Sequence, residues 1–77
     1  MLTLIHQPWQ KVEAAAALRN LARNADNQVA IAKAGGIAPL VALARDGTEK
    51  QNEQATMSLW NLAVNDDNQV AIAKALK

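Results

Sequence analysis

Two asparagines carry the clearest binding chemistry in the sequence. Asn20 and Asn61 lie 41 residues apart, each in the setting Leu-x-Asn-Leu-Ala within a stretch rich in helix formers. Asparagine is unfavourable inside a helix because its side chain competes for backbone hydrogen bonds, so its recurrence indicates a purpose. A side-chain amide offers a donor and an acceptor together. Such an amide is suited to capture of an extended peptide backbone. It is equally suited to a bond with a neighbouring loop that holds stacked helices together, and both interpretations stay open.

Three neighbouring side chains also have binding chemistry. Arg19 and Arg23 carry guanidinium groups that pair with carboxylates, and Trp60 offers the flat contact area that is common at binding hot spots. Each has a plainer explanation. The arginines fit a solvated helix face, and Trp60 fits packing against Met57 or against another copy of the chain.

Other chemistries are excluded by the residue types present. There is no cysteine, and the one histidine, His6, has no nucleophile or carboxylate at a meaningful spacing, so we expect no enzyme activity. The run Asp66-Asp67-Asn68 lacks the glycine and final Glu of a calcium loop, and helix capping explains it better. Gly35-Gly36 lacks the Gly-Lys-Ser/Thr of a phosphate loop. We therefore expect neither a metal nor a cofactor.

The stretch around each asparagine belongs to a repeat. Residues 18–34 return as residues 59–75 with 14 of 17 positions identical. Such a period indicates stacked units, none of which buries its apolar face alone. The chain has 77 residues, no Phe or Tyr, and mostly good helix formers. These features predict an all-α fold in which small alanines let the helices approach closely.

Charge and hydropathy narrow the class of partner. The net charge is +1, from eight Lys and Arg against seven Asp and Glu, which is too balanced to indicate nucleic acid or a membrane surface. No apolar run approaches the roughly 18 residues of a membrane span, and the first residues lack a basic leader. We expect an intracellular, soluble protein, cytoplasmic or nuclear.

Capping signals divide the chain into helices. Pro8 fits a first turn, Gly35-Gly36 stops a short helix, and Thr48 with Gln51 forms a capping box before a long one. The predicted helices cover residues 8–23, 27–34, 37–45, 49–64 and 68–77.

The junctions and the buried stripe can also be assigned. Asn24 is expected to end the first long helix in the left-handed conformation, and Asn65 to end the second. Asp26 and Asp67 are expected to cap the short helices that follow. Apolar residues at three- and four-residue steps predict a buried stripe on the first long helix. The stripe consists of Val12, Ala15, Leu18, Leu21 and Ala22.

The chain resembles the armadillo repeat family in four features. They are the three-helix unit, the period near 40, the segment Gly-Gly-Ile-Ala-Pro-Leu-Val at residues 35–41 and the Ala-Leu-x-Asn-Leu-Ala signature. The resemblance covers residues 12–75. It implies an armadillo-type superhelix, a right-handed α-solenoid of about five helices forming a single module over residues 1–77. Its parts are the long helix of a preceding unit (1–25), one complete unit (26–65) and the first helix of a following unit (66–77).

The resemblance also implies a function. Long helices of the family line a concave face that binds extended peptides, and an Asn near each helix end hydrogen-bonds the peptide backbone. Where importin-type members carry a Trp that builds lysine pockets, this chain has Ala16 and Met57. An acidic or aromatic-containing peptide therefore fits better than a basic one. The implied peptide-binding residues are Glu13, Ala16, Arg19, Asn20 and Arg23, followed by Gln54, Met57, Trp60, Asn61 and Val64.

An alternative function comes from the ends of the chain. Fewer than three repeats rarely stand alone, and arrays end in polar caps that this sequence lacks. The chain would then be a self-assembling repeat fragment, whether natural, excised or engineered. We expect a homo-oligomer, with a two-fold dimer favoured over head-to-tail stacking. The expected interface residues are Leu4, Ile5, Trp9 and Val12 at one end and Val70, Ile72 and Leu76 at the other.

Overall fold

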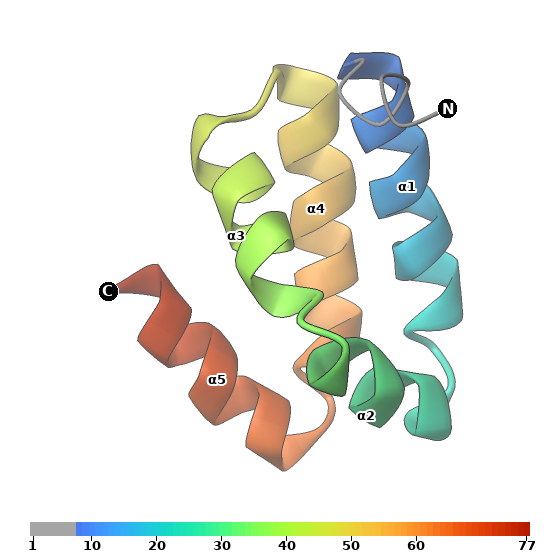
Figure 1. The fold of residues 1–77 in the computed structure, drawn as a ribbon, viewed down its shortest axis with the longest axis vertical. Helices are drawn as coiled ribbons and strands as arrows, with labels where there is room; N and C mark the ends of the chain where they lie inside the picture. Colours follow the sequence, from blue (N-terminus) through green and yellow to red (C-terminus); the bar gives the residue numbers. More distant parts are fainter. Residues whose placement is uncertain (1–7) are drawn as a thin grey trace.

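The computed structural model describes residues 8–77, and it describes side chains from residue 11 onward. The described part contains five α-helices and no strand, which confirms the all-α prediction (Figure 1). Leu4 and Ile5, together with the side chain of Trp9, lie outside the described part. The helices are α1 (Pro8–Leu21), α2 (Ala25–Lys33), α3 (Ile37–Asp46), α4 (Glu49–Leu62) and α5 (Asp66–Leu76).

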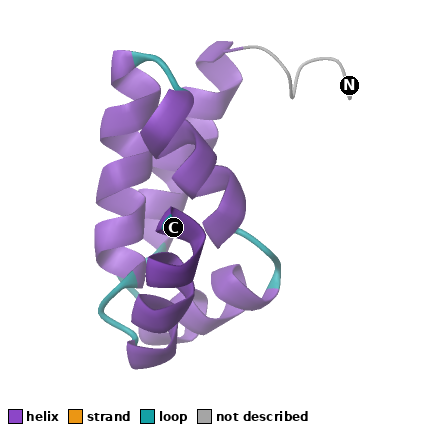
Figure 2. Cartoon of the chain, turned by 90° about the vertical axis from the view of Figure 1, so that its left-hand side faces the viewer, coloured by secondary structure: helices purple, strands orange, loops and turns teal. Residues whose placement is uncertain are grey.

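The two copies of the sequence repeat have equivalent places in the helix arrangement. Helices α1 and α4 lie side by side and run in the same direction, and α3 runs back along α4 (Figure 1). Helix α2 follows α1 just as α5 follows α4, so the repeated stretch forms the same helix–turn–helix twice. In the view turned by 90°, α5, which leads to the C-terminus, lies in front of the other helices (Figure 2). The molecule measures 33 × 25 × 18 Å.

Two predicted stop and start signals are confirmed. Gly35 has φ +83°, a left-handed conformation that glycine adopts without strain, and it separates α2 from α3. A Cβ on Gly36 would come within 2.6 Å of Ile31 Cγ2, so this position also needs a glycine. At the start of α4, Thr48 Oγ1 accepts from the Gln51 backbone N–H at 3.2 Å, and Gln51 Oε1 accepts from the Thr48 N–H at 2.9 Å. This reciprocal pair is the capping box.

The predicted caps of α2 and α5 are wrong by two residues. Asn24 and Asn65 are the N-caps, in extended conformations with φ −92° and −79°, and neither is left-handed. Their side-chain oxygens accept from the backbone N–H groups of Asn27 and Asn68, each at 3.0 Å. Asp26 and Asp67 therefore lie in the first helical turn, where a negative charge favours the helix dipole. The long helices correspondingly end two residues earlier than predicted, at Leu21 and Leu62.

Two substitutions distinguish the N-cap role of the asparagine from the dipole interaction of the aspartate. We expect Asn65→Ala to lower the free energy of unfolding by about 0.5–2 kcal/mol, because the Asn68 N–H loses its acceptor. Asp67→Ala should cost less, about 0.3–1 kcal/mol, because only a dipole interaction is lost. Urea denaturation followed by circular dichroism measures both. A larger loss for Asp67→Ala would restore the aspartate as the cap.

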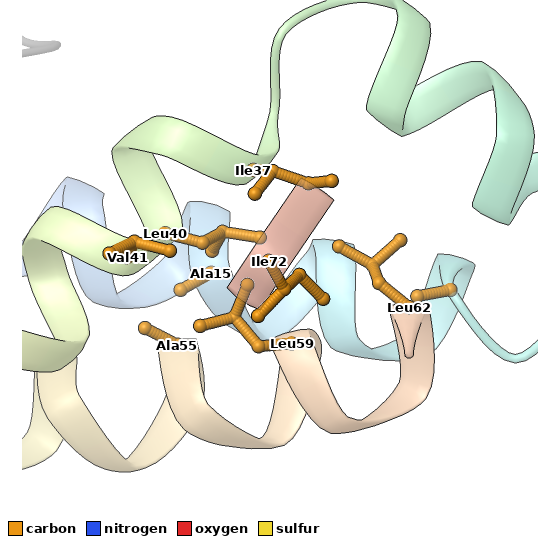
Figure 3. Close-up of a cluster of buried hydrophobic side chains, with 9 residues drawn as sticks. Ala15, Ile37, Leu40, Val41, Ala55, Leu59, Leu62 and Ile72 are labelled. Atoms are coloured by element: carbon orange, nitrogen blue, oxygen red, sulfur yellow. The ribbon is translucent and has the colours of Figure 1, made fainter. Parts of the chain in front are cut away.

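The core lies between the long helices and under α3 (Figure 3). Ala15 of α1 and Ala55 of α4 are both buried, so small residues contribute to this core. The predicted stripe on α1 is only partly correct. Ala15 and Ala22 are buried, Val12 and Leu18 are half-buried, and Leu21 is 51% exposed. The buried apolar residues are Ala15, Ala22, Ile37, Leu40, Val41, Ala55, Leu59, Leu62 and Ile72.

Candidate functional site

Side chains of α4 hydrogen-bond to the backbone of α1 along the line where the two helices meet. Asn61 Nδ2 donates to the Arg19 carbonyl at 2.8 Å. Ser58 Oγ donates to the Ala15 carbonyl at 2.6 Å. Asn61 therefore links the two long helices, and its acceptor lies on a helix and not on the neighbouring loop that was predicted. Its acceptor oxygen is not used in this bond.

Asn20 differs from Asn61 although the local sequence is the same. Asn20 is exposed, and its amide has no hydrogen-bond partner among the described residues. The reason is geometric: Asn61 faces α1, whereas no described helix lies at the corresponding side of α1. Asn20 consequently offers a free donor and a free acceptor at the surface.

An exposed apolar stripe runs along α4 beside this line. Met57 is 43% exposed, Trp60 77% and Val64 69%. A step of three residues places Met57 and Trp60 on one side of the helix, and Val64 lies two residues beyond the helix end at Leu62. Because Trp60 is so exposed, packing against Met57 does not account for it. The side chain is available to another molecule.

Arg19 links α1 to this stripe. Its Nη1 donates to Met57 Sδ at 3.8 Å, so the guanidinium lies next to the apolar residues of α4. We call Arg19, Met57, Trp60, Asn61 and Val64 the seam surface. It combines a cation from α1 with the amide of Asn61 and two apolar side chains from α4, and with Val64 from the turn after α4.

Two buried polar atoms next to the seam surface are unsatisfied. Among the described residues, neither Arg19 Nε nor Gln54 Oε1 has a hydrogen-bond partner. An unpaired buried polar group typically costs about 1–3 kcal/mol. One atom is a donor and the other an acceptor, which are the groups that a peptide backbone satisfies.

The other predicted peptide-binding residues are more scattered. Glu13 is exposed on α1, and Arg23 is exposed in the turn that follows it. Ala16 and Gln54 are half-buried. No hydrogen bond or ion pair joins Glu13 or Arg23 to the seam surface among the described side chains.

Sequence reasoning missed three polar residues that join the helices. Asn68 is 3% exposed, and its Nδ2 donates to the carbonyls of Gln28 at 3.0 Å and Leu62 at 3.1 Å. Gln28 Nε2 donates to the Ala22 carbonyl at 2.8 Å. Ser58 is fully buried. The repeat contained a signal for two of them, because the pair Asn-Gln recurs at residues 27–28 and 68–69.

The predicted oligomer residues fall into different environments. Val70 and Leu76 are exposed on α5, and Val12 is half-buried on α1. Ile72 is 9% exposed and packs in the core near Ile37 (Figure 3), so its side chain is not at the surface.

No group of three or more His, Cys, Asp or Glu side chains in residues 8–77 is placed to hold a metal ion. Taken singly, none of the described helices has the length and apolar character to cross a membrane. By length and composition alone, α2 and α3 meet that requirement only as a pair, bent by 85° at their break.

Comparison with known proteins identifies the architecture. A model of the armadillo/beta-catenin-like repeat matches residues 24–64, more than half of the chain, and this span holds α2, α3 and α4. Searches of the curated proteins and of the solved structures gave no match. Repeats of this kind generally serve as non-enzymatic scaffolds for protein interactions. The three-helix unit, its repetition and this match together show that the chain belongs to the armadillo repeat family.

Proposed function

We propose that the chain binds an extended peptide along the seam surface. The observation that carries the proposal is the exposed stripe of Met57, Trp60 and Val64 beside the Arg19 guanidinium. Contiguous apolar side chains rimmed by polar groups mark interaction sites on soluble proteins. The unpaired atoms Arg19 Nε and Gln54 Oε1 add support, because each would gain a hydrogen-bond partner if its side chain turned toward a bound backbone.

The chemistry of the surface favours a particular peptide. Trp60 and Val64 provide apolar contact area for an aromatic or aliphatic side chain. Arg19 and Arg23 provide guanidinium groups for carboxylates, and both are on the α1 side. A peptide with an acidic residue next to an aromatic one meets both requirements.

The two asparagines would contribute unequally. Asn20 has both its donor and its acceptor free. The donor of Asn61 is already occupied by the Arg19 carbonyl, so Asn61 would act toward a peptide only as an acceptor. With so few contacts, binding must be weak, and we expect a Kd above about 10 μM.

The test is titration of the full chain with a short acidic, aromatic peptide and with a matched peptide carrying Lys in place of Glu. Binding is followed by Trp fluorescence in a Trp9→Phe background, so that Trp60 alone reports. We expect Trp60→Ala, measured by calorimetry, to weaken binding at least about tenfold, because central aromatic residues dominate such contacts. Val29→Ala, which truncates an exposed apolar residue of α2 outside both proposed surfaces, is the control and should have no effect.

Asn20→Ala tests the asparagine contribution separately. Asn20 holds no other element in place, so this change removes only its surface amide. Unchanged affinity would eliminate backbone capture by the asparagines. Unchanged affinity in both Asn20→Ala and Trp60→Ala would eliminate the seam surface as the binding site.

Self-association is the second candidate function. It is favoured by Val70 and Leu76, which are 57% and 51% exposed on α5. Covering such side chains between copies removes apolar area from water. Sedimentation equilibrium should then show a dimer that dissociates on dilution, and Val70→Asp with Leu76→Asp should shift it to monomer. A monomer up to about 100 μM would reject this candidate.

A further inference from the structure

Met57 places a thioether at the surface of α4 beside a cation. The residue is 43% exposed, and its Sδ accepts a hydrogen bond from Arg19 Nη1 at 3.8 Å. A thioether sulfur is only a weak acceptor. The other methionine of the chain, Met1, lies outside the described residues. Met57 therefore combines access from solvent with a charged neighbour.

An exposed methionine sulfur reacts with hydrogen peroxide. A lone pair of Sδ attacks one peroxide oxygen, so that an S–O bond forms and the O–O bond breaks. The departing hydroxide takes the proton of the transferred hydroxyl group and leaves as water. The sulfur is oxidised to a sulfoxide, the peroxide is reduced, and methionine sulfoxide reductases reverse the change. A polar oxygen acceptor thereby replaces the weak sulfur acceptor.

The guanidinium beside Met57 has donors that lack a strong acceptor. Within the described part of the chain, Arg19 Nη1 donates only to the sulfur, and the buried Nε has no partner. A guanidinium N–H bonds more strongly to an oxygen than to a thioether sulfur. Because the methionine side chain has three rotatable bonds, the sulfoxide oxygen can turn toward these donors.

We infer that Met57 is a site of reversible oxidation by peroxides and that Arg19 holds the resulting sulfoxide. In the reduced state, the guanidinium makes only the weak bond to sulfur. In the oxidised state, it donates to the sulfoxide oxygen and joins α1 to α4 by a second polar bond, beside the one from Asn61 to the Arg19 carbonyl.

A consequence for ligand binding rests on the proposed function. Oxidation places a polar oxygen within the apolar stripe of the seam surface. It also occupies donors of Arg19 that a bound peptide would use. Peroxide would therefore close the seam surface to an acidic, aromatic peptide, and sulfoxide reduction would open it again.

The first experiment needs no ligand. The full chain is treated with hydrogen peroxide and mapped by mass spectrometry, with a free methionine peptide in the same mixture as reference. Met57 should gain one oxygen atom. In the isotope-labelled chain, the NMR signal of Arg19 Nε–H should move on oxidation and return after treatment with methionine sulfoxide reductases. Met57→Leu, which keeps Met1 and both tryptophans, should show no change at Arg19 after the same treatment.

A comparison with Arg19→Ala separates the oxidation from the hydrogen bond. In the wild type the sulfoxide oxygen gains a charged donor, whereas in Arg19→Ala this donor is missing. We expect oxidation to lower the Tm of Arg19→Ala by at least about 4 °C more than it lowers the Tm of the wild type. Thermal unfolding followed by circular dichroism measures both shifts.

Peptide titration tests the consequence for the seam surface after the peroxide has been removed. Oxidation should weaken peptide binding by the wild type at least about tenfold, whereas Met57→Leu should bind equally before and after treatment. Equal binding by the reduced and oxidised wild type would reject the regulation and leave the proposed function intact. A reduced wild type that does not bind would reject the proposed function, while the first two experiments still decide the oxidation and the bond to Arg19.

Two results would overturn the inference itself. One is a Met57 that stays unmodified while the reference peptide is oxidised. The other is a sulfoxide that leaves the Arg19 Nε–H signal unchanged and lowers the Tm of the wild type as much as that of Arg19→Ala.

Discussion

Leu62→Ala is expected to lower the free energy of unfolding by about 2–5 kcal/mol. Leu62 is 0% exposed, so truncation leaves a cavity among the long helices in addition to the lost burial. For a domain of this size the total stability is only about 4–12 kcal/mol. The loss is therefore a large fraction of the total, and urea titration followed by circular dichroism measures it.

Leu21→Ala is the matched control for this prediction. The residue has the same neighbours in sequence, Asn-Leu-Ala, and lies one repeat earlier at the same point of its helix. Because Leu21 is 51% exposed, its truncation should cost less than about 1 kcal/mol. Equal losses for the two variants would mean that α1 is covered in solution as fully as α4 is.

Asn68→Ala has the second-largest expected effect, about 2–3 kcal/mol. The buried amide of Asn68 donates to two carbonyls, those of Gln28 and Leu62, and so joins α5 to α2 and to the end of α4. Removing it deletes both bonds and leaves a small void where no water shell compensates. The free energy of unfolding from urea titration measures the loss.

The control is the same substitution at the equivalent position of the first copy. Asn27 Nδ2 makes one bond, to the Leu21 carbonyl at 3.0 Å, and the side chain is half-buried. Asn27→Ala should therefore cost about 1 kcal/mol or less. If Asn68→Ala costs no more than Asn27→Ala, the bond between α5 and α2 contributes nothing to stability.

Most of the helical framework could be predicted from local signals. Gly35 and the Thr48–Gln51 pair act within a few residues, so their effects are independent of the rest of the fold. The caps of α2 and α5 were predicted wrongly because two candidate residues, an Asn and an Asp, stand near each helix start. Asn24 and Asn65 cap because their oxygens reach the third N–H of the helix, a choice between neighbours that composition does not decide.

The candidate site was only partly predictable. Helical spacing predicts that Trp60 and Val64 face away from the Leu stripe, and both side chains are exposed, although Val64 lies beyond the end of α4. The contact of Arg19 with Met57 joins residues 38 positions apart, and the bond from Ser58 to Ala15 joins residues 43 apart. Sequence periodicity assigns a residue to a face but does not say which distant helix that face meets.

The side-chain hydrogen bonds also fall into local ones, which the repeat predicts, and long-range ones, which it does not. Those that span a few residues occur in both copies of the repeat: Asn27 and Asn68 each donate to a carbonyl six residues earlier, and Gln28 and Gln69 do likewise. The sequence by itself determined these bonds and the helices they connect, because all their partners are local. The contacts between units occur once, because only the second copy has a helix beside it.

The two asparagines summarise the division between sequence and structure. Sequence alone determined that Asn20 and Asn61 would each stand near the end of a long helix at the same side of a repeated unit. Only the tertiary structure decided that Asn61 binds the Arg19 carbonyl while Asn20 stays free. The tertiary structure likewise buries Leu62 and leaves Leu21 exposed. The physical reason is that burial and pairing depend on neighbours more than forty residues away, and identical local sequences have different neighbours.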